Sequence, residues 1–164
     1  MQRLLLEDFL GVAGDHQLLV GSDDQSADLG APGGDVADIA HGMLVLVGID
    51  ADQGMVVIEG RGKVSNFNSL TLAQQVEKLG VRTVVYTDIV CANQIKGPDI
   101  INTKELIDHT HLDIIYSGGI ASLQDLKNMR NAGVGGVMIG AALYTSKIKL
   151  KEAVMLYERG EQVE

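Results

Sequence analysis

Short apolar runs alternate with amphipathic segments along most of this chain. Residues 69–79 and 122–132 repeat apolar side chains at helical spacing, and Gly80 and Gly133 follow them as helix stops. Four continuous apolar runs have the length of buried strands and are too short for helices: residues 44–49, 83–86, 114–116 and 137–139. Such alternation predicts an α/β fold, with a parallel sheet built of βα units. The run at 44–49 shows no polar alternation, which indicates a strand covered on both faces.

Weaker patterns predict the remaining elements. An apolar-faced helix is expected at residues 1–10, a strand at 17–20, a short extra strand at 56–59 after a Gln53-Gly54 turn, and helices at 103–109 and 150–157. Residues 23–41 are rich in Asp and Gly and predict a loop with a poor helix. Ser69 and Ser122 are the expected helix caps, and Asp125 follows Ser122 at capping-box spacing.

Polar residues and glycines follow the predicted strands directly. These positions are Gly21-Ser22, Asp50, Thr87-Asp88, Ser117-Gly118 and Gly140. In a (βα) barrel and in an open parallel sheet alike, such positions gather at one edge, where ligands bind. Five core strands are too few for a complete eight-stranded barrel, which takes about 250 residues. The pattern therefore leaves an open sheet and part of a barrel as alternatives.

Two successive glycine segments suggest a phosphate site. Ser117-Gly118-Gly119 and Gly140-Ala141 each lie between a predicted strand and a predicted helix. Backbone N–H groups that converge at helix N-termini can hold a phosphate dianion. The alternative is that these glycines only end strands, just as Asp50 could cap the turn at Gly54 and Thr87 could be an ordinary strand residue.

Composition narrows the classes of partner. The formal net charge of -9 argues against nucleic-acid binding, which needs basic patches. The single cysteine, Cys91, excludes an internal disulfide framework and gives no metal cluster. No apolar run approaches the length of a membrane span, so a soluble cytoplasmic protein with one domain over residues 1–164 is expected.

Five stretches resemble one enzyme family in order along the chain: VGIDADQGMVVIEG, VVYTDI, GPDI, IIYSGGIASLQDL and GVMIGAALY. They resemble the C-terminal half of the histidine-biosynthesis isomerase family, the phosphoribosylformimino-5-aminoimidazole carboxamide ribotide isomerases. The likeness is dense over residues 43–157 and poor over 1–42, where residues 17–22 are similar to the family's fourth strand and its Gly-Ser loop. Thr87-Asp88-Ile89 and Ala142-Leu143-Tyr144 resemble the isomerase more than the related cyclase of imidazole glycerol phosphate synthase.

The resemblance implies a TIM-type barrel that is incomplete, with strands four to eight present and the first three missing. It implies an Amadori rearrangement of an aminoaldose bisphosphate (ProFAR) to the aminoketose (PRFAR), with no metal or organic cofactor. It places a catalytic carboxylate at Asp50 and an assisting hydroxyl at Thr87. It assigns phosphate binding to Ser117, Gly118, Gly119, Gly140 and Ala141 at one site, and to Gly21 and Ser22 at half of another.

The sequence also departs from the family pattern. The aspartate of the first strand and the Gly-rich loop after the third strand have no counterpart here. Ala92-Asn93 stands where the family carries Asp-Gly, and Gly60-Arg61 replaces Gly-Trp. These losses imply that the isolated chain is catalytically impaired or inactive. Two alternatives remain: a non-catalytic half-barrel that binds phosphate and self-associates to cover its open edges, and a fragment without an independent role.

Overall fold

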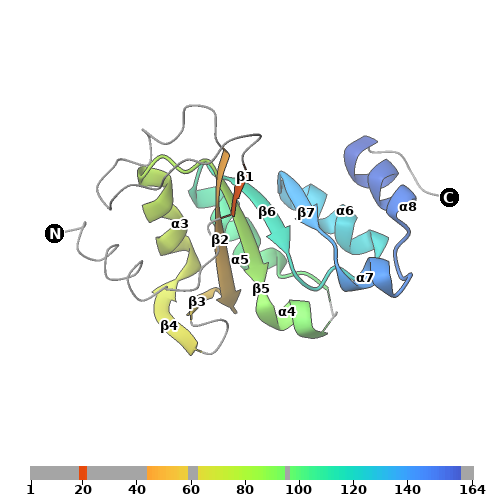
Figure 1. Cartoon of the computed structure of the whole chain (residues 1–164), viewed down its shortest axis with the longest axis horizontal. Helices are drawn as coiled ribbons and strands as arrows, with labels where there is room; N and C mark the ends of the chain where they lie inside the picture. Colours follow the sequence, from red (N-terminus) through yellow and green to blue (C-terminus); the bar gives the residue numbers. More distant parts are fainter. Residues whose placement is uncertain (1–18, 22–43, 59–62, 95–96, 160–164) are drawn as a thin grey trace.

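A parallel sheet forms the centre of the computed structural model, which describes residues 19–21, 44–58, 63–94 and 97–159. Its strands β2 (Leu44–Asp52), β5 (Thr83–Asp88), β6 (Asp113–Ser117) and β7 (Gly136–Met138) pair in that order, each parallel to the next (Figure 1). The parallel α/β sheet predicted from the apolar runs is confirmed.

Helices connect these strands and form a layer against the sheet. The main ones are α3 (Ser69–Lys78), α5 (Ile100–His109) and α6 (Leu123–Ala132), and α5 contacts both of its neighbours. Short helices α4 (Ile89–Gln94) and α7 (Ala141–Tyr144) follow β5 and β7, at the lower edge of the view in Figure 1, toward which β2 and β5 point. The chain continues into α8 (Leu150–Val154) and a π-helical turn, η1 (Met155–Arg159).

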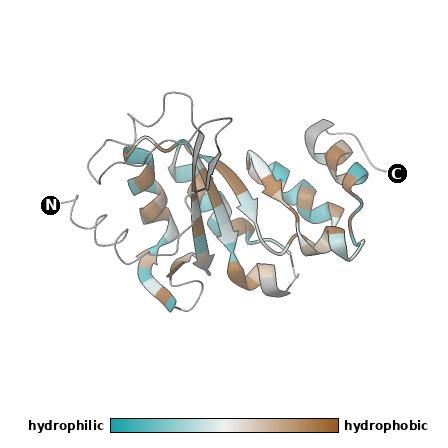
Figure 2. Cartoon of the chain, in the orientation of Figure 1, coloured by the Kyte–Doolittle hydropathy of each residue, from teal (hydrophilic) through white to brown (hydrophobic). Residues whose placement is uncertain are grey.

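The two faces of the sheet differ in burial. Ile49, Tyr86 and Tyr116 form one row across three strands and are almost fully buried against the helices. We call this side the covered face. Figure 2 shows hydrophobic residues along the strands and on parts of the helices. The opposite side, the open face, carries an exposed Gly48 and a half-buried Val85 in one row. The expectation that residues 44–49 are covered on both faces is therefore wrong at Gly48, because the described helices bury only the covered face.

Antiparallel strands flank β2 on its other edge. β1 (Leu19–Gly21) pairs with the beginning of β2, and β3 (Met55–Ile58) pairs with its end. The turn between β2 and β3 has positive φ at Gln53 and Gly54, the backbone typical of a tight hairpin. The extra strand predicted near 56–59 is confirmed, whereas β4 (Lys63–Asn68) was not predicted. The expected elements at 1–10 and 23–41 lie outside the described residues.

Capping residues and glycines set the ends of α3 and α6. Ser122 and Asp125 form the predicted capping box at α6, and Gly133 ends that helix in the left-handed conformation. Gly80 follows α3 with positive φ, also as predicted. The predicted cap of α3 is off by one residue, because the Asn68 side chain, not that of Ser69, accepts the hydrogen bond from Leu70 N–H.

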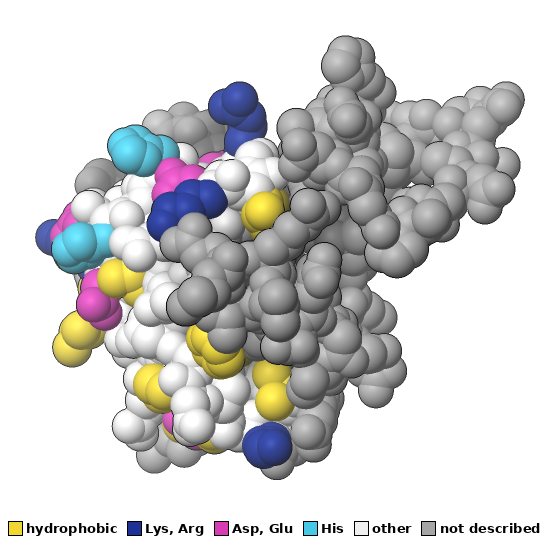
Figure 3. Space-filling model, turned by 90° about the vertical axis from the view of Figure 1, so that its left-hand side faces the viewer, with side chains coloured by type: hydrophobic (Ala, Val, Ile, Leu, Met, Phe, Trp, Pro, Cys, Tyr) yellow, Lys and Arg dark blue, Asp and Glu magenta, His cyan; other side chains and the backbone are white. Residues whose placement is uncertain are grey.

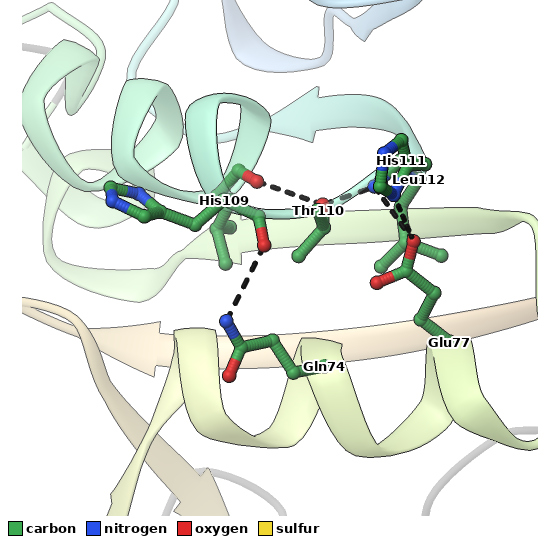
Figure 4. Close-up of polar contacts among 7 residues, drawn as sticks. Gln74, Glu77, His109, Thr110, His111 and Leu112 are labelled. Atoms are coloured by element: carbon green, nitrogen blue, oxygen red, sulfur yellow. Dashed lines mark hydrogen bonds and ion pairs between the residues drawn. The ribbon is translucent and has the colours of Figure 1, made fainter.

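Polar contacts join α3 to the turn between α5 and β6 (Figure 4). The carboxylate of Glu77 accepts a hydrogen bond from the backbone N–H of His111 at 2.7 Å and lies 3.1 Å from its ring Nδ1. Gln74 Nε2 donates to the carbonyl of His109. Figure 3 shows histidine, acidic and basic side chains close together on the described part of one side of the molecule. These contacts tie two helices together at the protein surface.

Candidate active site

Three polar side chains meet where the parallel strands end. Asp50 of β2 pairs in register with Thr87 of β5, and Thr87 pairs with Ser117 of β6. Neighbouring strands lie about 4.8 Å apart, so the three side chains stand side by side on the open face. All three are half-buried. A carboxylate beside two hydroxyls can accept or donate protons on a ligand that lies across this edge. The predicted gathering at one edge is confirmed for Asp50, Thr87 and Ser117.

The turn after β6 packs closely on its surroundings. Gly118 and Gly119 both have positive φ, which side-chain-bearing residues rarely adopt. A Cβ on Gly118 would lie 2.5 Å from the Asp88 carbonyl oxygen, and one on Gly119 would overlap the Gly97 carbonyl oxygen. Close backbone packing alone thus requires glycine at both positions.

Gly140 has a different environment. A Cβ there would meet nothing within 4 Å, so the space in front of this backbone is open. Gly140 and Ala141 follow β7, the strand next to β6, and both are exposed. Residues Ser117, Gly118, Gly119, Gly140 and Ala141 therefore form two adjacent backbone segments at one end of the sheet. We call them the phosphate-turn residues, after the phosphate site that the sequence predicts.

The N-terminus of α6 is already occupied by the protein itself. One carboxylate oxygen of Asp125 accepts hydrogen bonds from the N–H groups of Ala121 and Ser122, at 3.0 and 2.9 Å. The Asp125 charge also complements the positive end of the helix dipole. The N–H groups of Ala121 and Ser122 are therefore already bonded to a side chain of the protein.

The position of Gly21 is a second correction. β1 runs antiparallel to β2, and Gly21 pairs with Leu44, at the opposite end of β2 from Asp50. The expectation that Gly21 joins the other site residues at one edge is wrong, because it assumed a strand parallel to the rest. Ser22 lies outside the described residues.

A buried polar group underlies the site on the covered face. Asp88, the last residue of β5, is only 2% exposed, and its carboxylate accepts a hydrogen bond from Cys91 N–H at 2.6 Å. Burial raises the pKa of Asp88 above its ordinary value. Burial, together with the Asp88 carboxylate, raises the pKa of the Cys91 thiol to about 11, so this thiol stays protonated at neutral pH.

Sequence patterns did not point to Asp99 and Tyr116 as contributors to this region. Tyr116, fully buried in β6, accepts a hydrogen bond at its hydroxyl from Asp99 N–H at 2.8 Å. The Asp99 side chain in turn caps α5. An aromatic residue within an apolar run gives no sequence signal for such a contact. The one sequence signal was the position of Asp99 two residues after Gly97, which is typical of a helix cap.

Comparison with known proteins places the chain among relatives. A sequence model of the family described as histidine biosynthesis protein matches residues 35–149, well over half of the chain. The chain belongs to this family. Its fold is accordingly a set of parallel βα units of a TIM-type barrel, and the sheet formed by the described strands is not closed.

Three similar relatives carry the same name. A 1-(5-phosphoribosyl)-5-((5-phosphoribosylamino)methylideneamino) imidazole-4-carboxamide isomerase of Lachnoclostridium phytofermentans is 49% identical over 115 residues, which cover 70% of this chain and 48% of that enzyme. The isomerase of the same name from Thermoanaerobacter pseudethanolicus is 42% identical over 110 residues, or 67% of this chain and 46% of the relative. That of Desulforamulus reducens is 41% identical over 125 residues, covering 74% and 50%. The chain thus spans about half the length of these curated relatives.

Two features are absent from the described residues. No helix among them is long and apolar enough to cross a membrane. Within the same residues, no group of three or more His, Cys, Asp or Glu side chains is arranged to hold a metal ion.

Proposed function

We propose that this chain is the C-terminal part of a histidine-biosynthesis isomerase and that it binds the aminoaldose bisphosphate ProFAR, the substrate of the Amadori rearrangement to PRFAR. The observation that carries the proposal is the register Asp50–Thr87–Ser117, which puts the Asp50 carboxylate and the Thr87 hydroxyl beside Ser117, the first of the phosphate-turn residues. The names of the relatives support the same substrate.

Each residue has a defined part in this proposal. Asp50 exchanges a proton with the ligand, and the Thr87 hydroxyl hydrogen-bonds to the reacting sugar from the neighbouring strand. The phosphate-turn residues hold one phosphate through their backbone N–H groups.

The rearrangement needs one group to protonate the ribose ring oxygen and another to remove the C2 proton. Asp50 is the only one of the two family aspartates that this sequence supplies. The isolated chain therefore binds the substrate and turns it over slowly or not at all.

Calorimetric titration with ProFAR and, separately, with inorganic phosphate tests this proposal. Amide NMR shifts of Gly118, Gly119 and Gly140 should move with either ligand. Asp50→Asn should weaken binding of ProFAR and leave binding of phosphate unchanged. Asp113→Asn is the matched control, since Asp113 begins β6 at the opposite end of the sheet. Absence of shifts at all three glycines with both ligands would overturn the proposal.

A second candidate function, a non-catalytic half-barrel that self-associates, is favoured by the open face. Val85 and Ile115 are only half-buried there, and Met138 on β7 is 51% exposed. Burial of such apolar area between two copies is favourable, at about 25 cal/mol per Å². Sedimentation across a range of concentrations tests this. A chain that stays monomeric throughout would remove the candidate.

A further inference from the structure

One short segment links the two parts of the candidate site. Residues 97–102, here called the bridging segment, lead into the first turn of α5. At one end, Gly97 N–H donates a hydrogen bond to the Gly119 carbonyl at 3.1 Å. At the other end, the Asn102 side chain fills the space beside Gly54, where an added Cβ would lie 2.6 Å from its Oδ1. The segment therefore touches both the turn after β6 and the hairpin that follows Asp50.

Hydrogen bonds from two directions hold the bridging segment. Within it, the Asp99 carboxylate accepts bonds from the backbone N–H of Asn102 at 3.1 Å and from its side-chain Nδ2 at 2.6 Å. From the sheet, the Tyr116 hydroxyl accepts the bond from Asp99 N–H at 2.8 Å. Because Tyr116 precedes Ser117 directly in β6, the strand that leads into the phosphate turn also anchors the segment that packs on that turn.

We propose that Tyr116 is a positioning residue: its hydroxyl fixes the bridging segment, which through Gly97 holds the Gly118–Gly119 backbone in the conformation that binds phosphate. The inference rests on the proposed function for the identity of the ligand alone. Removal of the hydroxyl leaves Asp99 N–H without this partner, so the segment loosens and the Gly97–Gly119 bond weakens. Preorganised donors then lose their alignment before any ligand arrives.

The adjacent strand offers a matched control. Tyr86 pairs in register with Tyr116 and is equally buried, with ring centroids 6.2 Å apart. Burial raises the pKa of both phenols well above their ordinary value, so both keep their protons at neutral pH. However, the Tyr86 hydroxyl makes no hydrogen bond to the bridging segment, and the polar side chain that faces it is Ser69, at the start of α3. Tyr86→Phe and Tyr116→Phe thus delete the same atom at the same depth, and only the second deletion removes a bond to the segment.

Two measurements test the inference. The first is hydrogen exchange of the Gly97 and Asp99 amides without ligand, which should become about five- to tenfold faster in Tyr116→Phe and stay unchanged in Tyr86→Phe. The second is affinity for inorganic phosphate, which should fall about five- to tenfold in Tyr116→Phe alone. Asn102→Ala, which loosens the segment without a change in the sheet, should act in the same direction and decides the matter if Tyr116→Phe does not fold.

Equal exchange rates in the two phenylalanine variants would overturn the positioning role, whether or not phosphate binds. If the parent chain binds no phosphate but exchange accelerates only in Tyr116→Phe, the proposed function fails and the positioning role stands. If exchange accelerates while affinity for phosphate stays at the parent value, the segment is held by Tyr116 but does not position the ligand site, which also overturns the inference.

Discussion

The Asp88 carbonyl oxygen occupies the space that a side chain on Gly118 would need, since an added Cβ would lie 2.5 Å from it. Asp88 ends β5, and Gly118 follows directly after β6. The contact therefore sets how closely the two strand ends approach each other at the candidate site. Gly118 also has a φ of +123°, which side-chain-bearing residues avoid.

Gly118→Ala should lower the free energy of unfolding by about 2–3 kcal/mol. The substitution strains the backbone, and its methyl group clashes with the Asp88 carbonyl oxygen, which has to move. Denaturant unfolding measures the change. Gly48→Ala is the control, because a Cβ there meets nothing within 4 Å and the residue lies inside a strand. It should leave stability unchanged or raise it by a few tenths of a kcal/mol. Similar losses in the two variants would contradict the argument from local crowding.

Asp125→Ala should cost about 1–2 kcal/mol of stability, because the carboxylate satisfies the N–H groups of Ala121 and Ser122 at the start of α6. Asp108→Ala provides the comparison. Asp108 is exposed near the end of α5, and its loss should change thermal stability by less than about 0.5 kcal/mol. An equal, small effect in both variants would mean that the capping box contributes little to this helix.

Asp88 should make stability depend on pH in a direction opposite to that of a paired carboxylate. Burial raises the pKa of Asp88, so the folded chain holds this proton more tightly than the unfolded chain does. The free energy of unfolding should therefore fall as pH rises through the interval directly above the ordinary aspartate pKa of about 3.9.

Asp88→Asn should remove this fall, because the amide oxygen can still accept the Cys91 N–H bond without titrating. Denaturant midpoints measured at a series of pH values for both chains give the comparison. If the parent and the variant fall in parallel over that interval, the titrating group is not Asp88.

The spacing of apolar residues, together with glycines and capping residues at the ends of elements, was enough to predict the parallel strands and the ends of α6. An apolar run that ends in glycine indicates a buried strand followed by a turn. In the same way, the Ser122–Asp125 spacing and Gly133 marked the two ends of α6, and both lie where they were expected. The meeting of Asp50, Thr87 and Ser117 at one edge could be predicted because parallel strands all end at the same edge of a sheet. These features depend on residues close together in sequence, which is why the pattern contains them.

Features set by long-range pairing could not be predicted in this way. The direction of β1 depends on which edge of β2 it meets, and nothing in residues 17–21 encodes that choice. Likewise, the bond from Asp99 N–H to Tyr116 joins residues 17 apart, and its buried acceptor looks like any aromatic core residue. The exposed side of β2 also escaped prediction, because an apolar run reports the tendency to be buried and not what covers it.

Met138→Lys should abolish self-association if two copies bury the open face against each other. Met138 is 51% exposed on β7 and shares its row with Ser117, so a lysine there places a charge on the open face without a loss of buried core. Ile101→Lys is matched to it, since Ile101 is 82% exposed on α5, in the helix layer. Sedimentation at several concentrations should show a monomeric Met138→Lys chain beside parent and Ile101→Lys chains that associate alike. Loss of association in Ile101→Lys alone would instead mean that copies meet through their helices.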